Sequence, residues 1–226
     1  MGKSIYNNQL FGGLKSDEIN KVLGCSNAKF ETFEDGQTVF QKDDVINNIG
    51  IVTEGEFNLI SQKFNGARVI VTTLERNDMF GEALIFSTAT TSPYDLVSFG
   101  KSEALFIPKS FFITVCPNAC SFHNKLVSNM LAILSDKIVM LNNKMKILNA
   151  ESIKSKIAIY LLSIYNKNNK LIFDMPMKRQ ELSEFLGVTR PSLSREFSNM
   201  QKDEIIDVYR SSIKILDLKK LYELAE

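Results

Sequence analysis

Residues 178–195 constrain the fold most strongly, because two short amphipathic segments meet there at a single glycine. Leu182, Phe185 and Leu186 lie at helical spacing, so they share one buried stripe. The side chains expected to point away from this stripe are Arg179, Gln180 and Ser183. Gly187 stands where the first helix must end, because a residue without a Cβ enters the left-handed conformation at low cost.

The second segment carries the signals of a helix start. Thr189 can cap the helix, and Pro191 is tolerated in the first turn because an amide there has no helical partner. Leu193, Phe197 and Met200 continue an apolar face, and the opposite face carries Arg190, Ser194 and Arg195. The two helices predict a helix-turn-helix for the major groove of DNA, where arginine donates two bonds to guanine. The alternative is an ordinary helical hairpin with solvated arginines.

The chain after this motif predicts a small sheet. Residues 205–209 and 213–216 are β-branched and partly alternating, and a polar turn at 210–212 joins them. Residues 171–173 predict a strand that pairs with this hairpin, and Asp217 can cap a last helix. Helices followed by such a hairpin define a winged helix. At the tip of the wing, Arg210 is open to two interpretations, a solvated turn residue or a phosphate contact.

Composition indicates a globular chain with two domains. At 226 residues the chain exceeds the commonest domain size, and the predicted DNA-reading unit takes only about its last third. Hydrophobic residues make up 44% and charged residues 23%, which is typical of a soluble protein. The formal net charge of +1 requires DNA binding to come from a local basic patch. No membrane-spanning apolar run or signal-peptide core occurs, so we expect a cytoplasmic protein.

Few residues could hold a metal or support catalysis. The chain has three cysteines and one histidine, and no C-x-x-C pair. Cys116 and Cys120 would need two further ligands, so buried, inert thiols are the favoured interpretation and no metal site is predicted. The glycine motifs of nucleophile elbows, phosphate loops and dinucleotide sites do not occur, so we assign no catalytic residues and predict no enzyme.

Residues 29–108 change to short apolar runs separated by turn signals such as Glu54-Gly55 and Phe99-Gly100. Many short strands at this spacing favour a closed β-roll or barrel. The expected strands are 38–40, 49–52, 57–60, 69–73, 96–98 and 104–107. Residues 79–86 are less strand-like and predict a single helical turn from Gly81, whose free amides would form a seat for an anion.

After Pro108 the pattern becomes helical for a long distance. One apolar seam repeats at alternating steps of four and three, and its members are Val127, Leu131, Leu134, Ile138, Leu141, Met145 and Leu148. A second stripe consists of Met130, Ile133, Met140 and Ile147. A helix must bury both stripes, so we expect one against its own chain and the seam in a symmetric dimer. The alternative is a helix packed wholly inside its own chain. A polar break at 149–152 marks the expected domain boundary.

This pattern resembles the Crp/Fnr family of bacterial transcription regulators from about Phe30 onward. The most specific segment is R-Q-E-L-S-E-F-L-G-V-T-R-P-S-L-S-R (179–195), and Gly81-Glu82 in the β-roll comes second. The resemblance implies an α+β protein with a cyclic-nucleotide-binding-like β-roll (1–108), a long dimerisation helix with its lead-in (109–150) and a winged helix-turn-helix (151–226). It implies a homodimer on two-fold symmetric double-stranded DNA, with RNA polymerase as a candidate partner and no membrane. The alternative is a ligand-binding or protein-interaction module whose helix-turn-helix no longer reads DNA.

Matching by position implies that Arg190 and Arg195 read bases and that Arg179 and Thr189 contact phosphates. We also expect Pro191 and Ser194 at the base edges, and Lys178, Ser192 and Arg210 at phosphates. Two positions depart from the family pattern, because Pro191 replaces a common Glu that accepts from cytosine and Lys178 replaces the usual Ser or Thr cap. The half-site preference of well-known members is therefore not expected here.

The ligand cassette departs further. The expected effector pocket consists of Gly81, Glu82, Ala83, Thr91, Ser92 and Pro93. Members that bind cyclic AMP carry an arginine for the phosphate shortly after Gly-Glu, whereas here no arginine or lysine lies between Arg76 and Lys101. Cyclic AMP is therefore not expected. The chain has too few cysteines to ligate an iron–sulfur cluster. A haem would need a ligand in the β-roll, and the single histidine, His123, lies outside it. We expect His123 to be a surface or packing residue, and control by another small molecule or by none.

Overall fold

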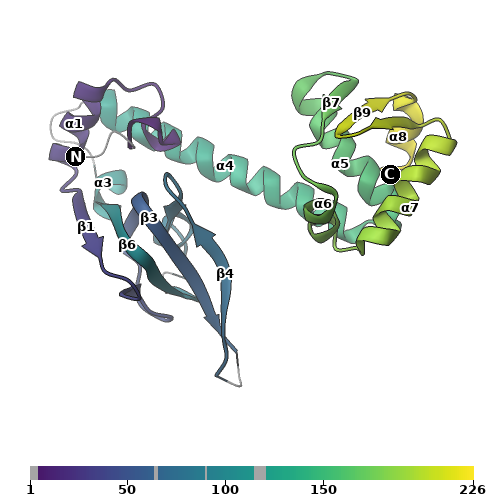
Figure 1. Ribbon diagram of the computed structural model, residues 1–226. Helices are drawn as coiled ribbons and strands as arrows, with labels where there is room; N and C mark the ends of the chain where they lie inside the picture. The colour runs from purple at the N-terminus through teal and green to yellow at the C-terminus, as the bar shows by residue number, and fades with distance from the viewer. Residues whose placement is uncertain (1–4, 64–65, 90, 115–120) are drawn as a thin grey trace. The chain divides into compact units, whose positions relative to one another are not determined.

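The computed structural model describes residues 5–63, 66–89, 91–114 and 121–226 (Figure 1). Contacts within the chain divide it into two compact units, one up to Asp136 and one from Lys137. This division falls inside the long helix α4 (Ser121–Asn149), whereas the sequence places the boundary at 149–152. The division into segments ending at residues 108 and 150 stays a prediction.

The first unit is built on an antiparallel six-stranded sheet, which confirms the predicted β-roll (Figure 1). The strand order is β1-β6-β3-β4, while β2 pairs with β6 and β5 pairs with β3. The strand β1 was not expected from the sequence pattern. The strands are β1 (Lys29–Phe33), β2 (Thr38–Phe40), β3 (Asn48–Gln62), β4 (Arg68–Leu74), β5 (Met79–Phe80) and β6 (Asp95–Pro108).

The two longest strands are continuous where the sequence predicts breaks. β3 runs through Glu54 and Gly55, and its register with β6 shifts on both sides of Glu54. Gly55 has a φ of 71°, and a Cβ there would lie 2.3 Å from the Ser102 hydroxyl oxygen. The glycine therefore marks a β-bulge where two backbones approach closely. The breaks expected at Glu54-Gly55 and Phe99-Gly100 are wrong, since β6 also continues through its glycine.

Helices cover part of this sheet and share its core. The predicted single turn is confirmed as α2 (Glu82–Ile85), which begins after Gly81 at a φ of 82°. Buried side chains of the sheet pack against the first half of α4 through Leu126, Met130 and Ile133. The remaining helices of this unit are the short 3₁₀ helices η1 (Ile5–Asn7) and η2 (Gln9–Phe11), and α1 (Ser16–Cys25) and α3 (Lys109–Ile113).

The second unit is a winged helix-turn-helix, as the sequence predicts (Figure 1). Its sheet has the order β7-β9-β8, so the strand before the helices pairs with the hairpin after them. Asp217 accepts the Lys220 amide at 2.9 Å and caps the last helix, which confirms the predicted cap. The elements are α5 (Ile153–Asn168), β7 (Ile172–Asp174), α6 (Arg179–Leu186), α7 (Arg190–Lys202), β8 (Ile206–Tyr209), β9 (Ser212–Ile215) and α8 (Leu218–Glu223).

The second apolar stripe of α4 is buried only in part. Met130 and Ile133 belong to the core of the first unit, and Ile147 belongs to the core of the second. Met140 is 61% exposed, so the expectation that the whole stripe is buried is wrong at this residue. The reason is that neither core cluster includes this stretch of the helix.

Candidate nucleic-acid interface

The turn between α6 and α7 has the geometry that its sequence predicts. Gly187 ends α6 in the left-handed conformation, with φ 66° and ψ 39°. Its amide and that of Val188 donate to carbonyls in the last turn of α6 at 3.2 Å and 3.0 Å. Thr189 Oγ1 then accepts the Ser192 amide at 3.3 Å and caps α7. These local bonds hold the two helices in a sharp and defined turn.

One face of α7 is buried and the other is exposed. Its buried face consists of Leu193, Phe197 and Met200, which pack with Leu182 and Leu186 of α6 in one core cluster. The exposed residues in its first two turns are Arg190, Pro191, Ser194 and Arg195. An exposed helix start that bears two arginines has the shape and charge to enter the major groove. All four expected base-reading residues lie on this face, and their contacts with bases stay a prediction.

Four of the five expected phosphate contacts are at least partly open to solvent. Lys178 and Thr189 are exposed, and Ser192 is half-buried. The Lys178 amide donates to a carboxylate oxygen of Glu181 at 2.9 Å, so Glu181 stabilises the start of α6 where a Ser or Thr cap is missing. Arg210 occupies the hairpin turn at a φ of 55°, with its guanidinium 5.4 Å from the ring centre of the tyrosine before it.

Arg179, the fifth expected phosphate contact, is packed against α7. Its guanidinium carbon lies 3.5 Å from the centre of the Phe197 ring, and its Nη1 is buried without a hydrogen-bond partner among the described residues. Burial lowers the pKa of Arg179. Ser183 is buried as well and donates to the Gln180 carbonyl at 2.7 Å. The expectation that Arg179 and Ser183 point away from the core is therefore wrong, because Arg179 packs against Phe197 of α7 and Ser183 is buried.

The predicted seam on α4 is open to solvent along most of its length. Its exposed members are between 45% and 61% exposed and consist of Leu131, Ile138, Leu141, Met145 and Leu148. Val127 and Leu134 are half-buried. A row of large apolar side chains at this exposure is typical of a surface that contacts another chain.

The β-roll contains a cavity of about 260 Å³. Five of the six predicted pocket residues line it, and they are Gly81, Glu82, Ala83, Ser92 and Pro93. The sixth, Thr91, is not among the lining residues and forms an isolated bridge with Val45. Most other lining side chains are apolar, including Phe40 and Phe80, and among the described residues that line it there is no lysine or arginine. The Ser92 hydroxyl already donates to the Tyr94 carbonyl at 2.7 Å.

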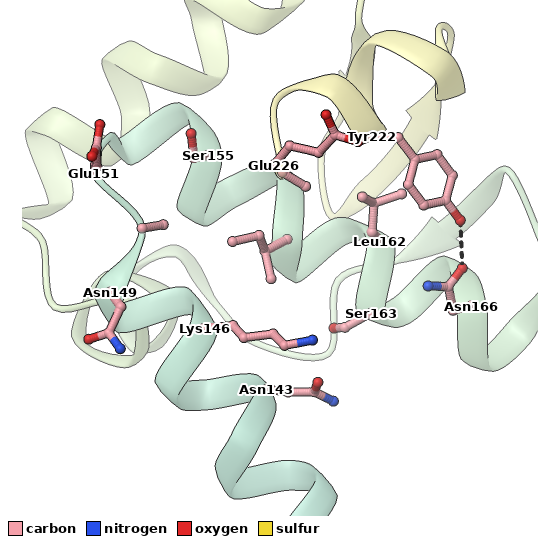
Figure 2. A pocket seen from close by; sticks show the side chains of 13 residues that line it. Asn143, Lys146, Asn149, Glu151, Ser155, Leu162, Ser163, Asn166, Tyr222 and Glu226 are labelled. Carbon is pink, nitrogen blue, oxygen red and sulfur yellow. Dashed lines mark hydrogen bonds between the residues drawn. The ribbon is translucent and has the colours of Figure 1, made fainter.

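A larger hollow of about 750 Å³ lies in the second unit and is lined by α4, α5 and the segment from Tyr222 onward (Figure 2). Lys146 and Asn143 line one side of it, and the Tyr222 hydroxyl donates to Asn166 at 3.0 Å. None of its lining residues belongs to α6, α7 or the wing hairpin, so the hollow is separate from the exposed face of α7.

In the part of the chain that the structure describes, no three His, Cys, Asp or Glu side chains gather as metal ligands would. No helix in that part is long and apolar enough to cross a membrane. His123 is buried with its ring centre 4.5 Å from that of Phe111, which confirms the packing interpretation. Cys25 is exposed, and Cys116 and Cys120 lie outside the described residues.

A β-roll with a cavity, followed by a winged helix-turn-helix with arginines on its exposed helix start, defines a class of DNA-binding transcription regulators. Residues 30–118 match the family model of the cyclic nucleotide-binding domain, and residues 155–224 match that of the Crp-like helix-turn-helix domain. The chain belongs to the Crp/Fnr family, whose members are transcription regulators.

Individual relatives agree with this assignment. The nitrogen fixation regulation protein FixK of Bradyrhizobium diazoefficiens is 26% identical over 202 residues, covering 85% of this chain and 80% of FixK. The global nitrogen regulator of Synechococcus elongatus is 21% identical over 195 residues, covering 84% and 86%. The solved catabolite activator protein of Thermus thermophilus has a TM-score of 0.53 at 17% identity, covering 96% of this chain and 98% of that one, and shows the same fold.

Proposed function

We propose that this chain is a homodimeric, sequence-specific DNA-binding regulator in which the exposed face of α7 reads base edges. The observation that supports it most is the orientation of α7, whose apolar side chains are buried while Arg190 and Arg195 are exposed in its first two turns. Because the formal net charge is only +1, attraction to DNA depends on such a local patch.

The side chains on this face suit a particular kind of base reading. Arg190 and Arg195 can each donate two parallel bonds to the O6 and N7 of guanine, and Ser194 can donate or accept. Pro191 has no acceptor for cytosine and offers only apolar contact, for which the thymine methyl group is the partner. The preferred half-site therefore differs from that of family members with Glu at this position.

Contacts with phosphates would set the position of α7 in the groove. Lys178 and Thr189 are exposed at the starts of α6 and α7, and Ser192 lies in the first turn of α7. Arg210 is exposed at the tip of the wing hairpin and would meet the backbone beside the groove. Such contacts supply affinity and orientation without sequence information.

A two-fold dimer would present two copies of this surface. The exposed seam of α4 supplies the apolar surface, and its alternating spacing is that of a two-stranded coiled coil. Two recognition helices related by two-fold symmetry would enter successive major grooves about 34 Å apart. The expected DNA site is therefore a two-fold symmetric sequence.

Control of this dimer would not involve cyclic AMP. A buried phosphate requires a cation or several hydrogen-bond donors to replace its hydration, and the only charged side chain among the described lining residues of the cavity is the carboxylate of Glu82. We propose that another small molecule controls the protein, or that none does, without haem or an iron–sulfur cluster.

Binding to duplexes that the wild-type protein selects from a random pool tests the proposal. Arg195→Ala is expected to weaken specific binding by about 1 to 3 kcal/mol and to relax the preference at one base position. Lys202→Ala removes an exposed cation from the end of the same helix and is the matched control. If Arg190→Ala and Arg195→Ala both bind like the wild type, the proposal is wrong, and a platform for protein contacts becomes the better interpretation of the motif.

A further inference from the structure

One side-chain contact links the start of α6 to the buried face of α7. Arg179 is the first residue of α6, and its guanidinium carbon lies 3.5 Å from the centre of the Phe197 ring. A cation this close to the face of a ring is attracted by the negative potential of that face. Phe197 is buried and belongs to the same helix as Arg190 and Arg195. The contact therefore connects the recognition helix to the helix before it.

The guanidinium is packed on one side and is not simply extended into solvent. Its Nη1 is buried, and no acceptor among the described residues receives its protons. The ring face is then the group that compensates for the lost hydration of this nitrogen. Arginine suits such a contact better than lysine, because the guanidinium is planar and more weakly hydrated than an ammonium group. The contact thus depends on the shape of arginine as well as on its charge.

We propose that Arg179 is a positioning residue, which orients α7 through the Phe197 ring and so sets how Arg190 and Arg195 meet the base edges. The inference rests on the proposed function, because base reading is what the contact would orient. The two parallel hydrogen bonds from one arginine to one guanine tolerate little displacement, so a rotation of α7 would break hydrogen bonds to base edges. Nonspecific attraction to phosphates depends on charge and would change little.

Two variants separate this role from a direct phosphate contact. Arg179→Lys keeps the positive charge and removes the planar group, whereas Phe197→Leu keeps an apolar side chain in the core and removes the ring. Phe185→Leu is the matched control, because this ring belongs to the same domain but contacts Tyr160 and Lys144. The measurements are the affinities for a selected and a scrambled duplex over a range of salt concentrations.

Arg179→Lys and Phe197→Leu are each expected to lower the ratio of specific to nonspecific affinity by about fivefold or more. Both should leave the salt dependence of nonspecific binding unchanged, since the number of charges near the phosphates is the same. The double variant should lose no more than the stronger single variant, because both changes remove one contact. Phe185→Leu should leave the ratio unchanged.

The opposite pattern would overturn the inference. If Arg179→Lys keeps full discrimination while Arg179→Ala reduces the salt dependence, Arg179 acts as a point charge on a phosphate. An unchanged ratio of specific to nonspecific affinity in Phe197→Leu also refutes the positioning role. If Phe197→Leu does not fold, the comparison of Arg179→Lys with Arg179→Ala decides between the two roles. Should the wild type select no duplex, the proposed function fails by itself. The contact between Arg179 and Phe197 is then measured without DNA, in a double-mutant cycle of Arg179→Lys and Phe197→Leu by thermal unfolding of the full chain. An interaction free energy of zero between the two changes refutes the contact.

Discussion

Truncation of one seam residue gives a sharp test of the proposed dimer. Leu141 lies on the α4 seam and is 57% exposed in the single chain. Full burial of a leucine contributes about 1.5 to 3 kcal/mol, so covering its exposed part contributes roughly 1 to 1.5 kcal/mol in each protomer. Two copies would meet in the proposed two-fold dimer, and Leu141→Ala should therefore cost about 2 to 3 kcal/mol of dimer stability. The dimer dissociation constant should rise roughly 30- to 150-fold.

Val139 provides the matched control for this change. It is also 57% exposed, but it lies two residues from Leu141 and so faces the opposite side of the helix. Val139→Ala should leave the dissociation constant unchanged when both variants are compared by sedimentation equilibrium. Equal shifts in the two variants, or no shift in Leu141→Ala, would refute the reasoning. Replacement of both Leu134 and Leu141 with aspartate should give monomers that no longer bind DNA tightly.

Three further predictions concern the stability of the two units and the binding of cyclic AMP. A hydrogen bond and ion pair with Lys154 lower the pKa of Asp203, so the pair contributes stability above the unfolded pKa of about 3.9 that is lost as the pH falls through the lower folded pKa. The difference in melting temperature between the wild type and Lys154→Met should therefore shrink below about pH 3.9, and a constant difference would contradict this. Gly50→Ala places a Cβ 1.9 Å from the Phe80 ring and should cost about 1 to 3 kcal/mol or more, whereas Gly24→Ala in α1 meets nothing within 4 Å and should stabilise by about 0.5 kcal/mol. Melting temperatures that shift in the same direction would show that this account of the two sites is wrong. Cyclic AMP should leave the melting temperature unchanged, and a saturable rise would show that the cavity binds it.

The helix-turn-helix and its wing could be predicted from the sequence because their signals are local. Gly187 ends one helix and Thr189 caps the next through bonds to residues only a few positions away. The spacing of Leu193 and Phe197 identifies the buried face of α7, and the exposed arginines follow from it. A family resemblance added the expected roles of these residues, which no pattern of periodicity contains.

The errors arose where partners distant in sequence decide the outcome. The Glu54-Gly55 pair is a turn signal by composition, yet the neighbouring strand lies so close that the glycine becomes a bulge inside β3. Arg179 lies outside the apolar stripe of α6 by periodicity, yet the ring of Phe197 on the next helix holds its guanidinium. No signal in the linear pattern marks that contact, because only the packing of α6 against α7 brings the two side chains together.

The sequence by itself determined the two helices of the helix-turn-helix, the caps at Thr189 and Asp217, the wing hairpin and the apolar seam of α4, because each depends on spacing and on bonds between near neighbours. Tertiary structure alone decided which glycine became a bulge, which apolar side chains complete the lining of the β-roll cavity and which arginine is packed against the Phe197 ring. Those features depend on the distance between segments that are far apart in the chain, and that distance exists only once the sheet and the helices have packed together.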